Sequence, residues 1–366
     1  MTSESDGQIT TSPPLGSTPP RRGVGRVLRL TVQILGCAIG IGLLGWCVSI
    51  ALRPSNRAAL KQLQTASAMD IALLIGLSII VLLASGGAFR ETLRPIKRLP
   101  MLDVQATNVI ACLLALLPFK LSVFFRVLVH NRRDGVPVLT IGAWFGAVGV
   151  VILCVLLPMI GASVWRGKAD DLWFITSGGG MLAMLLTVLL VARTFRSEEG
   201  WAWAQRSYAK LPLPRSIGAD SKFATTFFEK SHEGVRMLAA PRVVFGCALL
   251  RVIDIGAQAG RIAVAAAIVD SPLHWEQALL AGSSFFLIGA AAPTGALGVR
   301  EAGTASLLTK FLPGIAMETF ATIVLTVTAV EAIVMIVGSI AAGAYLRPDR
   351  LMRGKTKQRL GEREKE

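Results

Sequence analysis

The feature that most constrains this chain is a series of long apolar blocks that contain no charged residue. Five of these blocks are 30–52, 71–89, 135–165, 172–192 and 277–299. About 18 or more apolar residues without charge are typical of a helix that crosses a lipid bilayer. Only 17% of the 366 residues are charged, compared with about 25% in soluble domains. The sequence therefore predicts an all-α integral membrane protein.

The two ends of the chain differ from the apolar blocks between them. Residues 1–26 begin with a stretch rich in Ser, Thr, Pro and Gly, which cannot bury a core, and we expect a disordered cytoplasmic segment there. Residues 347–366 form a basic cytoplasmic tail. The membrane domain is expected to cover 27–346, with halves of about 27–165 and 172–346. Its first apolar block is too long for a signal peptide and is interpreted as the first membrane helix.

Counting the membrane crossings leads to a conflict with the distribution of charge. The apolar segments are 27–52, 70–89, 104–130, 136–163, 172–192, 243–269, 277–309 and 317–346. If all of them crossed, the segment 193–242, with its nine Lys and Arg, would lie outside the cell. Basic loops tend to remain in the cytoplasm. The conflict disappears if 104–130 and 277–309 each enter and leave on one side, so we predict a polytopic bundle of about six crossing helices and two re-entrant broken hairpins.

Helix-breaking residues lie near the middle of both predicted hairpins. Proline removes a helical hydrogen bond and glycine tolerates turns. In the first hairpin the break is at Pro118, which is followed by the basic residues Lys120 and Arg126. In the second hairpin the break residues are Pro293, Gly295 and Gly298. With this topology, 27 Lys and Arg lie inside and six lie outside. That balance favours a multi-pass protein of the cytoplasmic (inner) membrane, with both termini and an interfacial segment, 193–242, on the cytoplasmic side.

The order of the predicted segments repeats along the chain. Each half runs crossing, crossing, hairpin, crossing, and the two halves have opposite orientations. Inverted repeats whose broken helices meet near the middle of the membrane are typical of transporters. The sequence therefore favours a transporter architecture.

Ionisable residues inside apolar segments are the candidate functional residues, because charge at membrane depth is costly and usually faces a cavity or a partner. Arg251, Asp254, Gln258 and Arg261 follow one another at spacings of three, four and three, which places them on one helix face. They would line a polar path. Alternatively, Arg251 and Asp254 neutralise each other and Arg261 extends to the outer membrane surface.

Arg300 and Glu301 begin the returning limb of the second hairpin, where free N–H groups and the helix dipole favour an anion. Arg300 is a candidate to hold a lipid phosphate. Glu301 would cap the free amides, or pair with Arg300 and take part in proton coupling. The structural alternative is a self-capped hairpin. Lys120 and Arg126 are interpreted first as interfacial anchors of the first hairpin and second as contacts to lipid head groups.

Glu331 lies near the middle of the last apolar segment and is expected to need a basic partner or to bind a proton there. The candidate partners are Arg251, Arg261 and Arg300. Both a structural bridge and a proton-linked switch are open interpretations.

Other classes of site are not predicted. The cysteines, which lie in apolar blocks without a C-x-x-C pair, are Cys37, Cys47, Cys112, Cys154 and Cys247. The histidines, which are far apart and expected to be solvated, are His130, His232 and His274. We therefore predict no metal site and no cofactor. The net charge of +15 lies in loops and tails without interleaved aromatic residues, so no nucleic-acid binding is predicted. Without a nucleophile–base pattern, we expect no enzyme.

The stretch 292–302, APTGALGVREA, resembles the P-x-G-G-L-G-x-R-E signature of the lysylphosphatidylglycerol synthase transmembrane-domain family. Its members include the flippase half of aminoacyl-phospholipid synthases and stand-alone flippase-like proteins. The chain has Gly295-Ala296 where the family often has Gly-Gly. In the stretch 118–126, Ser122 and Val123 replace the Gly-Glu pair of the family's P-x-R-x-G-E pattern. The resemblance implies a helical membrane domain over about 27–346, and without a soluble synthase domain it does not imply aminoacyl transfer.

The resulting hypothesis is a flippase-like lipid translocator. Its ligands would be membrane lipids, and its cargo an anionic phospholipid or a lipid-linked intermediate. The alternative is a non-catalytic membrane scaffold or accessory subunit, whose partner would be a lipid- or glycan-modifying membrane enzyme. A membrane-embedded transferase is the least favoured interpretation.

Overall fold

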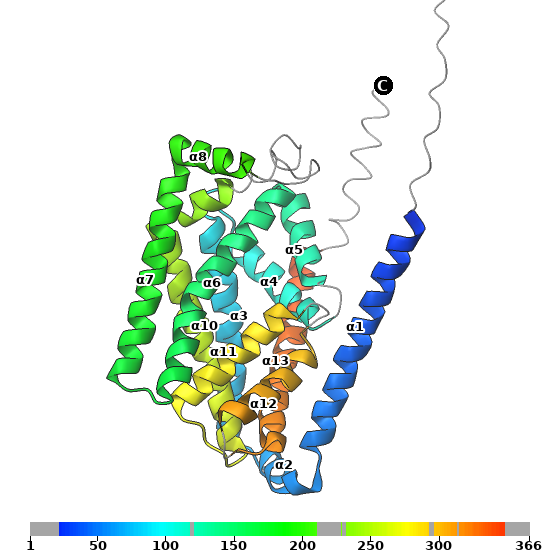
Figure 1. The fold of residues 1–366 in the computed structure, drawn as a ribbon. Coiled ribbons are helices and arrows are strands. Elements are labelled where there is room, and N and C mark those ends of the chain that lie inside the picture. Colours follow the sequence, from blue (N-terminus) through cyan, green and yellow to red (C-terminus); the bar gives the residue numbers. More distant parts are fainter. Residues whose placement is uncertain are drawn as a thin grey trace, which may run out of the picture.

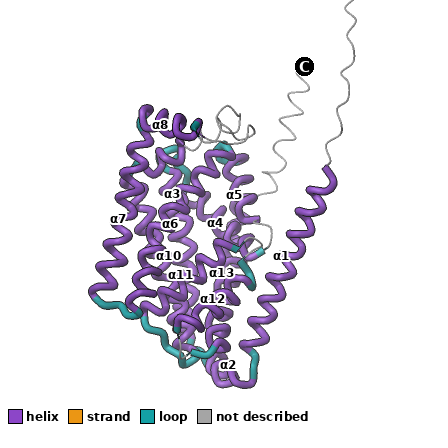
Figure 2. The backbone as a smooth tube through the Cα atoms, viewed as in Figure 1, coloured by secondary structure: helices purple, strands orange, loops and turns teal. Residues whose placement is uncertain are grey.

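The computed structural model describes residues 22–117, 121–210, 228, 232–292, 296–312 and 315–347. Within these ranges the chain consists of helices joined by short connections and contains no strand (Figure 2). The elements are α1 (Arg22–Ala51), η1 (Pro54–Asn56), α2 (Arg57–Gln64), α3 (Ala68–Leu93), α4 (Met101–Leu116), α5 (Leu121–Arg132), α6 (Val138–Arg166), α7 (Asp171–Arg196), α8 (Glu198–Ala209), α10 (Pro241–Ile268), α11 (Trp275–Ala291), α12 (Val299–Phe311) and α13 (Met317–Leu346). The predicted terminal segments lie largely outside the described residues, since 1–21 and 348–366 are not among them.

Five of the described helices are long and apolar enough to cross a membrane, namely α3, α6, α7, α10 and α13. A sixth crossing is formed if α1 is counted together with the η1–α2 segment, which is bent by 63° from it after Ala51. These six helices coincide within a few residues with the six predicted crossings. The prediction of a polytopic helical membrane fold is confirmed.

Two pairs of shorter helices occupy the places of the two predicted hairpins. Helices α4 and α5 pack against each other and form hairpin 1, and α11 and α12 pack against each other and form hairpin 2. Figure 1 shows hairpin 1 in the half of the bundle that ends at α8, and hairpin 2 in the half that ends at α2. The two hairpins therefore enter the bundle from opposite ends.

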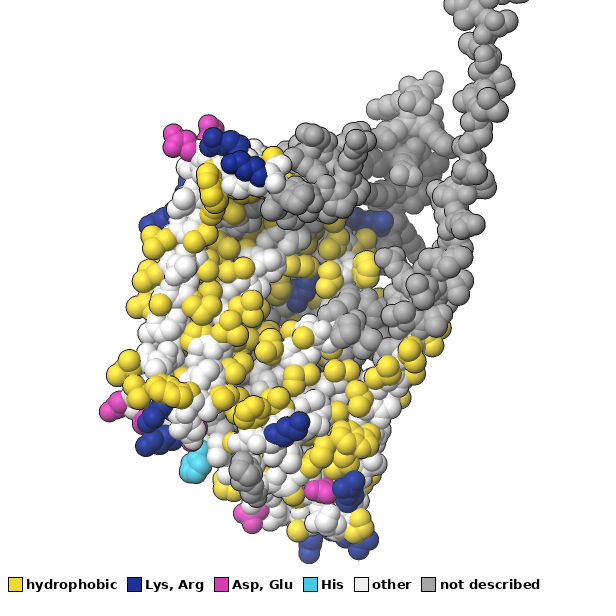
Figure 3. Space-filling model, in the orientation of Figure 1, with side chains coloured by type: hydrophobic (Ala, Val, Ile, Leu, Met, Phe, Trp, Pro, Cys, Tyr) yellow, Lys and Arg dark blue, Asp and Glu magenta, His cyan; other side chains and the backbone are white. Residues whose placement is uncertain are grey.

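The outer surface of the bundle is apolar over the flank and charged at its ends. On α13, Ile333, Val337 and Ile340 are 60%, 63% and 70% exposed, at spacings that place them on one helix face. Figure 3 shows hydrophobic side chains spread over the flank, with most charged side chains of this face near the two ends. A belt of this kind would promote aggregation in water and fits the hydrocarbon layer of a bilayer.

The centre of the bundle is formed by α3 and α10, which pack closely along their length. A Cβ atom added at Gly87 of α3 would lie 3.2 Å from the Leu250 side chain of α10, and one added at Gly260 of α10 would lie 3.2 Å from the Leu77 side chain of α3. Small residues at such positions allow two helix backbones to approach, which is how membrane helices gain packing energy without a hydrophobic driving force. Helices α6, α11 and α13 also contact α10, so this helix lies at the middle of the fold.

Local sequence signals fix the starts of three helices. Ser67, Asp170 and Ser197 precede α3, α7 and α8, and each side chain accepts a hydrogen bond from the backbone N–H three residues later. Such caps satisfy N–H groups that have no partner within the helix. At Asp170, the Arg166 side chain and the N–H of Trp173 hold the pKa of the carboxyl well below its usual range. This cap therefore stays ionised to a lower pH than a free aspartate would.

Helix α8 begins the segment predicted to lie at the membrane surface. It runs across the end of the bundle, next to the end of α7 (Figure 1). Trp201 on α8 stacks on His232, with ring centroids 4.7 Å apart. Most of 211–231 lies outside the described residues.

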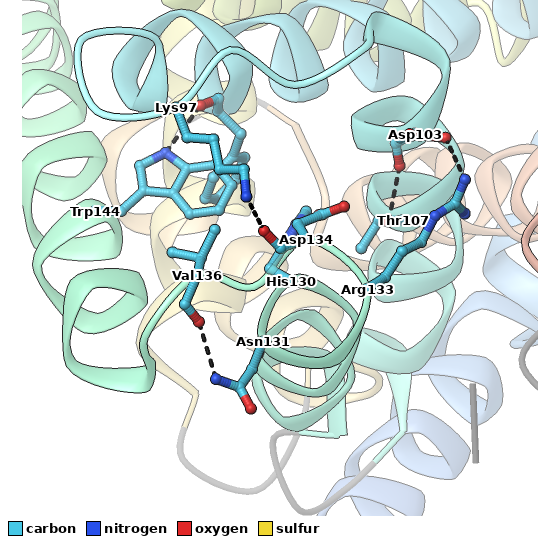
Figure 4. A network of polar contacts seen from close by, with 10 residues as sticks. Lys97, Asp103, Thr107, His130, Asn131, Arg133, Asp134, Val136 and Trp144 are labelled. Atoms are coloured by element: carbon cyan, nitrogen blue, oxygen red, sulfur yellow. Dashed lines mark hydrogen bonds and ion pairs between the residues drawn. The ribbon is translucent and has the colours of Figure 1, made fainter. Parts of the chain in front are cut away.

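A polar network fixes the base of hairpin 1 (Figure 4). His130 Nδ1 lies 2.7 Å from a carboxylate oxygen of Asp134, whose backbone carbonyl accepts a hydrogen bond from Lys97. The Trp144 indole packs edge-on against the His130 ring and donates a 2.8 Å hydrogen bond to the carbonyl of Phe89. His130 is only 1% exposed, so the expectation that it is solvated is wrong. Residues such as Trp144, which lie on other elements, bury it, and its position in the sequence does not reveal these neighbours.

Candidate functional site

The tips of the two hairpins meet in the middle of the bundle. The backbone N–H of Ala296, in hairpin 2, donates a 3.1 Å hydrogen bond to the carbonyl of Ala115, near the end of α4. Helix α4 ends at Leu116 and α5 begins at Leu121, while α11 ends at Ala291 and α12 begins at Val299. Both hairpins are therefore broken where the sequence predicts it. Of the predicted break residues, Pro118, Lys120, Pro293 and Gly295 lie outside the described residues.

Gly298 connects the break of hairpin 2 to α12 and to α1. Its backbone has φ +81°, a conformation that residues with a side chain rarely adopt. A Cβ atom at this position would collide with the carbonyl oxygen of Gly40 and lie 2.9 Å from the nitrogen of Leu44, both on α1. Gly40 in turn faces the carbonyl of Leu297. The glycines thus allow the tip of hairpin 2 to rest on the backbone of α1.

The four polar residues predicted to share one face of α10 all lie inside the bundle. The Arg251 guanidinium lies 2.7 Å from the Asp254 carboxylate, and Gln258 donates a 3.3 Å hydrogen bond to the same carboxylate. Arg261 is 2% exposed. The predicted Arg251–Asp254 pair therefore forms, but the alternative in which Arg261 extends to the membrane surface is wrong, because a carboxylate inside the bundle binds this side chain.

That carboxylate belongs to Glu331, at the middle of α13. One of its oxygens lies 3.1 Å from Arg300 and 3.5 Å from Arg261. Arg261 also donates a 3.4 Å hydrogen bond to the hydroxyl of Ser78 on α3. Of the three candidate partners of Glu331, the structure thus selects Arg261 and Arg300 and not Arg251. The bridge joins α10, α12 and α13 at membrane depth, where the loss of one partner would leave a charge uncompensated.

Glu301 is fully buried, and it both caps α12 and pairs with Arg300, while its predicted part in proton coupling stays a prediction. One carboxylate oxygen accepts a 2.6 Å hydrogen bond from the backbone N–H of Gly298, which caps α12. The other lies 2.9 Å from Arg300 Nε and accepts a 2.7 Å hydrogen bond from Thr328 on α13. The Arg300 guanidinium also lies 4.2 Å above the ring of Phe285, a favourable cation–π geometry. Arg300 is therefore held by two carboxylates and an aromatic ring.

A cavity of about 180 Å³ lies beside this network, where the hairpin tips meet. Its wall is built from α3, α4, α10, both limbs of hairpin 2 and α13, and most of its lining is apolar. The polar groups in the wall are Ser85, Cys112, Asp254, Gln258, Arg300 and Glu331. Four of the predicted candidates thus line one space, and Arg251, Arg261 and Glu301 lie directly behind them.

Arg126 on α5 is not at the membrane surface. The side chain is buried, donates a 2.6 Å hydrogen bond to the Asn108 side chain and lies 4.3 Å above the ring of Phe89. The interpretation of Arg126 as an interfacial anchor is therefore wrong. Asn108 on α4 also donates to the carbonyl of Leu82 on α3, and these contacts draw the α5 side chain inward.

Several residues of the site were not singled out from the sequence. They are Ser78, Ser85, Asn108, Phe285 and Thr328. Asn108 gave the clearest signal, since an amide inside an uncharged apolar stretch needs hydrogen-bond partners. Serine and threonine hydroxyls can bond to the carbonyl of the preceding helical turn, so their positions in an apolar segment do not predict that they belong to a site.

The cysteines show the packing expected of small apolar residues. Cys47, Cys154 and Cys247 are buried, and Cys112 is partly exposed to the cavity. The side chain of Cys37 lies outside what the structure describes. Within the described ranges, no three His, Cys, Asp or Glu side chains gather as they would to hold a metal ion.

The comparison with known protein families identifies the chain. The model of the lysylphosphatidylglycerol synthase TM region matches residues 33–338, which is most of the sequence. The chain belongs to this family. No curated protein and no solved structure gave a match.

Membership of the lysylphosphatidylglycerol synthase TM family gives the signature of hairpin 2 a structural meaning. Its last glycine, its arginine and its glutamate correspond to Gly298, Arg300 and Glu301. Gly298 rests on α1, Arg300 lines the cavity, and Glu301 caps α12. These three residues thus lie where α12 begins, and Gly298 and Arg300 contact α1, α11 and α13.

Proposed function

We propose that this protein is a flippase-like translocator that moves an anionic phospholipid or a lipid-linked intermediate across the membrane. The observation that carries the proposal is the cavity at the meeting point of the two hairpin tips. A lipid head group that crosses a bilayer needs polar partners at membrane depth, and broken helices can supply them. Arg300, Asp254 and Glu331 stand in the cavity wall.

The order of the elements supports a transport cycle. The first half consists of α1, α3, hairpin 1 and α6, and the second consists of α7, α10, hairpin 2 and α13. We propose that these halves are an inverted repeat, since each contributes one hairpin from its own end of the bundle. In such architectures, alternating access results from one repeat moving relative to the other around a central site.

The ion pairs around the cavity suggest how a head group would be accommodated. Arg300 and Arg261 share one oxygen of Glu331. An anionic head group in the cavity would repel this carboxylate and weaken its hold on the two arginines, which would loosen hairpin 2 and α10 from α13. Substrate binding would in this way change the contacts that hold the hairpin.

We further propose that translocation involves no covalent step. Among the described residues, the carboxylates beside the cavity are all held in ion pairs: Asp254 with Arg251, Glu301 with Arg300, and Glu331 with Arg261 and Arg300. A paired carboxylate is a weak base. This supports a transport role over an enzymatic one.

The protein is proposed to lie in the cytoplasmic membrane with both termini and α8 on the cytoplasmic side. Single cysteines at Gln205 on α8 and Thr65 beyond α2, introduced into a chain without its native cysteines, test this. We expect a membrane-impermeant thiol reagent to label Thr65→Cys in whole cells and to label Gln205→Cys only after lysis. Both positions are exposed. Labelling of Gln205→Cys in whole cells would refute the orientation.

Transport is tested by filling the cavity without altering its charges. Purified protein is reconstituted with head-group-labelled phospholipids, and a membrane-impermeant quencher is added. Wild type should lose signal beyond the outer-leaflet fraction. Ser85→Phe places a ring in the cavity and should reduce movement to the level of protein-free vesicles. Ser49→Phe is the matched control, because Ser49 is exposed on α1 and the same change should leave movement intact.

The outcomes of this experiment separate the two candidate functions. Movement that Ser85→Phe abolishes and Ser49→Phe preserves would support a translocator with its path through the cavity. If folded wild-type protein moved no lipid in the panel, the scaffold function would be favoured, and capture of a membrane enzyme partner would be the next measurement. Equal movement in both variants would place the path elsewhere.

A further inference from the structure

The ionisable residues at membrane depth do not balance. Among the described residues, the bundle interior contains the arginines Arg126, Arg251, Arg261 and Arg300 and the carboxylates Asp254, Glu301 and Glu331. Four positive groups thus face three negative ones, an excess of one positive charge. An uncompensated charge inside a membrane is costly, and such residues usually have a functional partner.

The excess charge is located at Arg126. The other three arginines each form an ion pair with a carboxylate. Arg126 contacts the neutral groups Asn108, Phe89 and Cys112 instead of a carboxylate, and its Nη1 atom, like one nitrogen of each of the other three arginines, is buried without a hydrogen-bond partner. No carboxylate in the described part of the chain forms an ion pair with Arg126, although the residue is only 8% exposed. A guanidinium in this state still has donors available for an anion.

Arg126 lies one side chain away from the central cavity. The Asn108 oxygen that accepts its hydrogen bond also lies 3.8 Å from the sulfur of Cys112. Cys112 lines the cavity together with Asp254 and Glu331. An anion that entered the cavity would therefore encounter the excess positive charge from the side of hairpin 1.

We propose that Arg126 binds the phosphate of a phosphodiester lipid, and that Arg300 does not provide this contact. The inference rests on the proposed function and names the recognition group. A phosphodiester carries one negative charge, which equals the excess in the interior. The planar guanidinium matches the two free oxygens of a phosphodiester in a bidentate geometry. Arg300, in contrast, is already bound by Glu301 and Glu331.

Binding by purified protein tests the inference independently of transport. Detergent-solubilised protein is titrated with dioctanoyl phosphatidylmethanol, a minimal phosphodiester lipid, and with dioctanoylglycerol, which has the same chains without phosphate. Bound lipid is counted by native mass spectrometry, and soluble dimethyl phosphate is added as a competitor. Wild type should prefer the phosphodiester lipid, and dimethyl phosphate should compete if the phosphate alone suffices for binding. Competition by dimethyl phosphate would show that the site binds phosphodiesters in general. Without competition, the site would be assigned to phosphodiesters that are joined to acyl chains.

Variants of Arg126 supply the decisive comparison. Arg126→Gln should reduce affinity for the phosphodiester lipid about tenfold to a hundredfold, as expected for the loss of a hydrogen bond to a charged group, and leave dioctanoylglycerol unaffected. Arg126→Lys keeps the charge and should retain part of the preference. Arg166→Gln, at the end of α6 outside the site, is the control. We expect Arg126→Gln to fold, because it removes a buried charge that has no counter-ion.

Several results would overturn the inference. One is a wild type that binds both lipids equally, which needs no variant to observe. Another is a folded Arg126→Gln that keeps the wild-type preference. Protein that selects the phosphodiester through Arg126 but moves no lipid would refute the proposed function and leave this inference intact. Lipid movement in a protein whose phosphodiester binding does not depend on Arg126 would refute this inference and leave the proposed function intact.

Discussion

Replacing Glu331 with alanine is expected to lower the free energy of unfolding by about 3–5 kcal/mol, the cost of removing one partner from a buried ion pair. The carboxylate is the only one that contacts Arg261 among the described residues, and it is one of two that contact Arg300. Without it, Arg261 keeps only the 3.4 Å hydrogen bond to Ser78. Chemical unfolding in detergent, monitored by circular dichroism, measures the change.

Glu318→Ala is the matched control on the same helix. Glu318 lies in the first turn of α13 and pairs with Arg53, whose side chain is 53% exposed. Surface pairs of this kind contribute at most about 1 kcal/mol. If Glu331→Ala proved as mild as Glu318→Ala, the bridge would not be what holds α10, α12 and α13 together. Glu331→Gln should lie between the two, because it keeps the shape and loses the charge.

Replacing Gly298 with alanine is expected to be similarly severe, for a reason that involves no charge. A residue with a side chain in a sparsely populated backbone conformation costs about 1–3 kcal/mol, and the added Cβ would also collide with the α1 backbone at Gly40. The tip of hairpin 2 would have to move away from α1. We expect a large loss of stability and of lipid movement, measured by unfolding and by the reconstituted assay.

Gly42→Ala supplies the comparison for this change. Gly42 is also a glycine of α1, but a Cβ there would meet nothing within 4 Å. Alanine is the better helix former by about 1 kcal/mol, so this variant should be as stable as wild type or slightly more so. Equal effects of the two substitutions would show that the tip of hairpin 2 does not depend on the α1 contact.

The membrane architecture could be predicted because its signals are local. A block such as 172–192 is apolar over its whole length, and α7 (Asp171–Arg196) extends it by only a few residues. The two hairpins followed from proline and glycine in the middle of an apolar segment, together with the placement of basic loops. Each signal is contained in one stretch of sequence, so no knowledge of neighbouring helices was needed.

The pairing of charges could not be predicted in the same way. Arg261 and Glu331 are separated by 70 positions, and only the packing of α10 beside α13 brings them together. The same limit explains Arg126, whose spacing from Pro118 is as consistent with an anchor at the membrane surface as with a buried position. Asn108 and Phe89 hold it inside, and both lie on other helices.

The hydrogen bond between Ala296 and Ala115 joins the two hairpins through main-chain atoms alone. Substitution of either side chain leaves the N–H donor and the carbonyl acceptor of this bond in place. During divergence this joint between the hairpins can therefore persist while the residues around it change. Proline at 296 is the exception, because it has no N–H to donate. Two chains of this fold could therefore share the same mechanical joint with no identical residue at either position, and an alignment of their sequences would not show it.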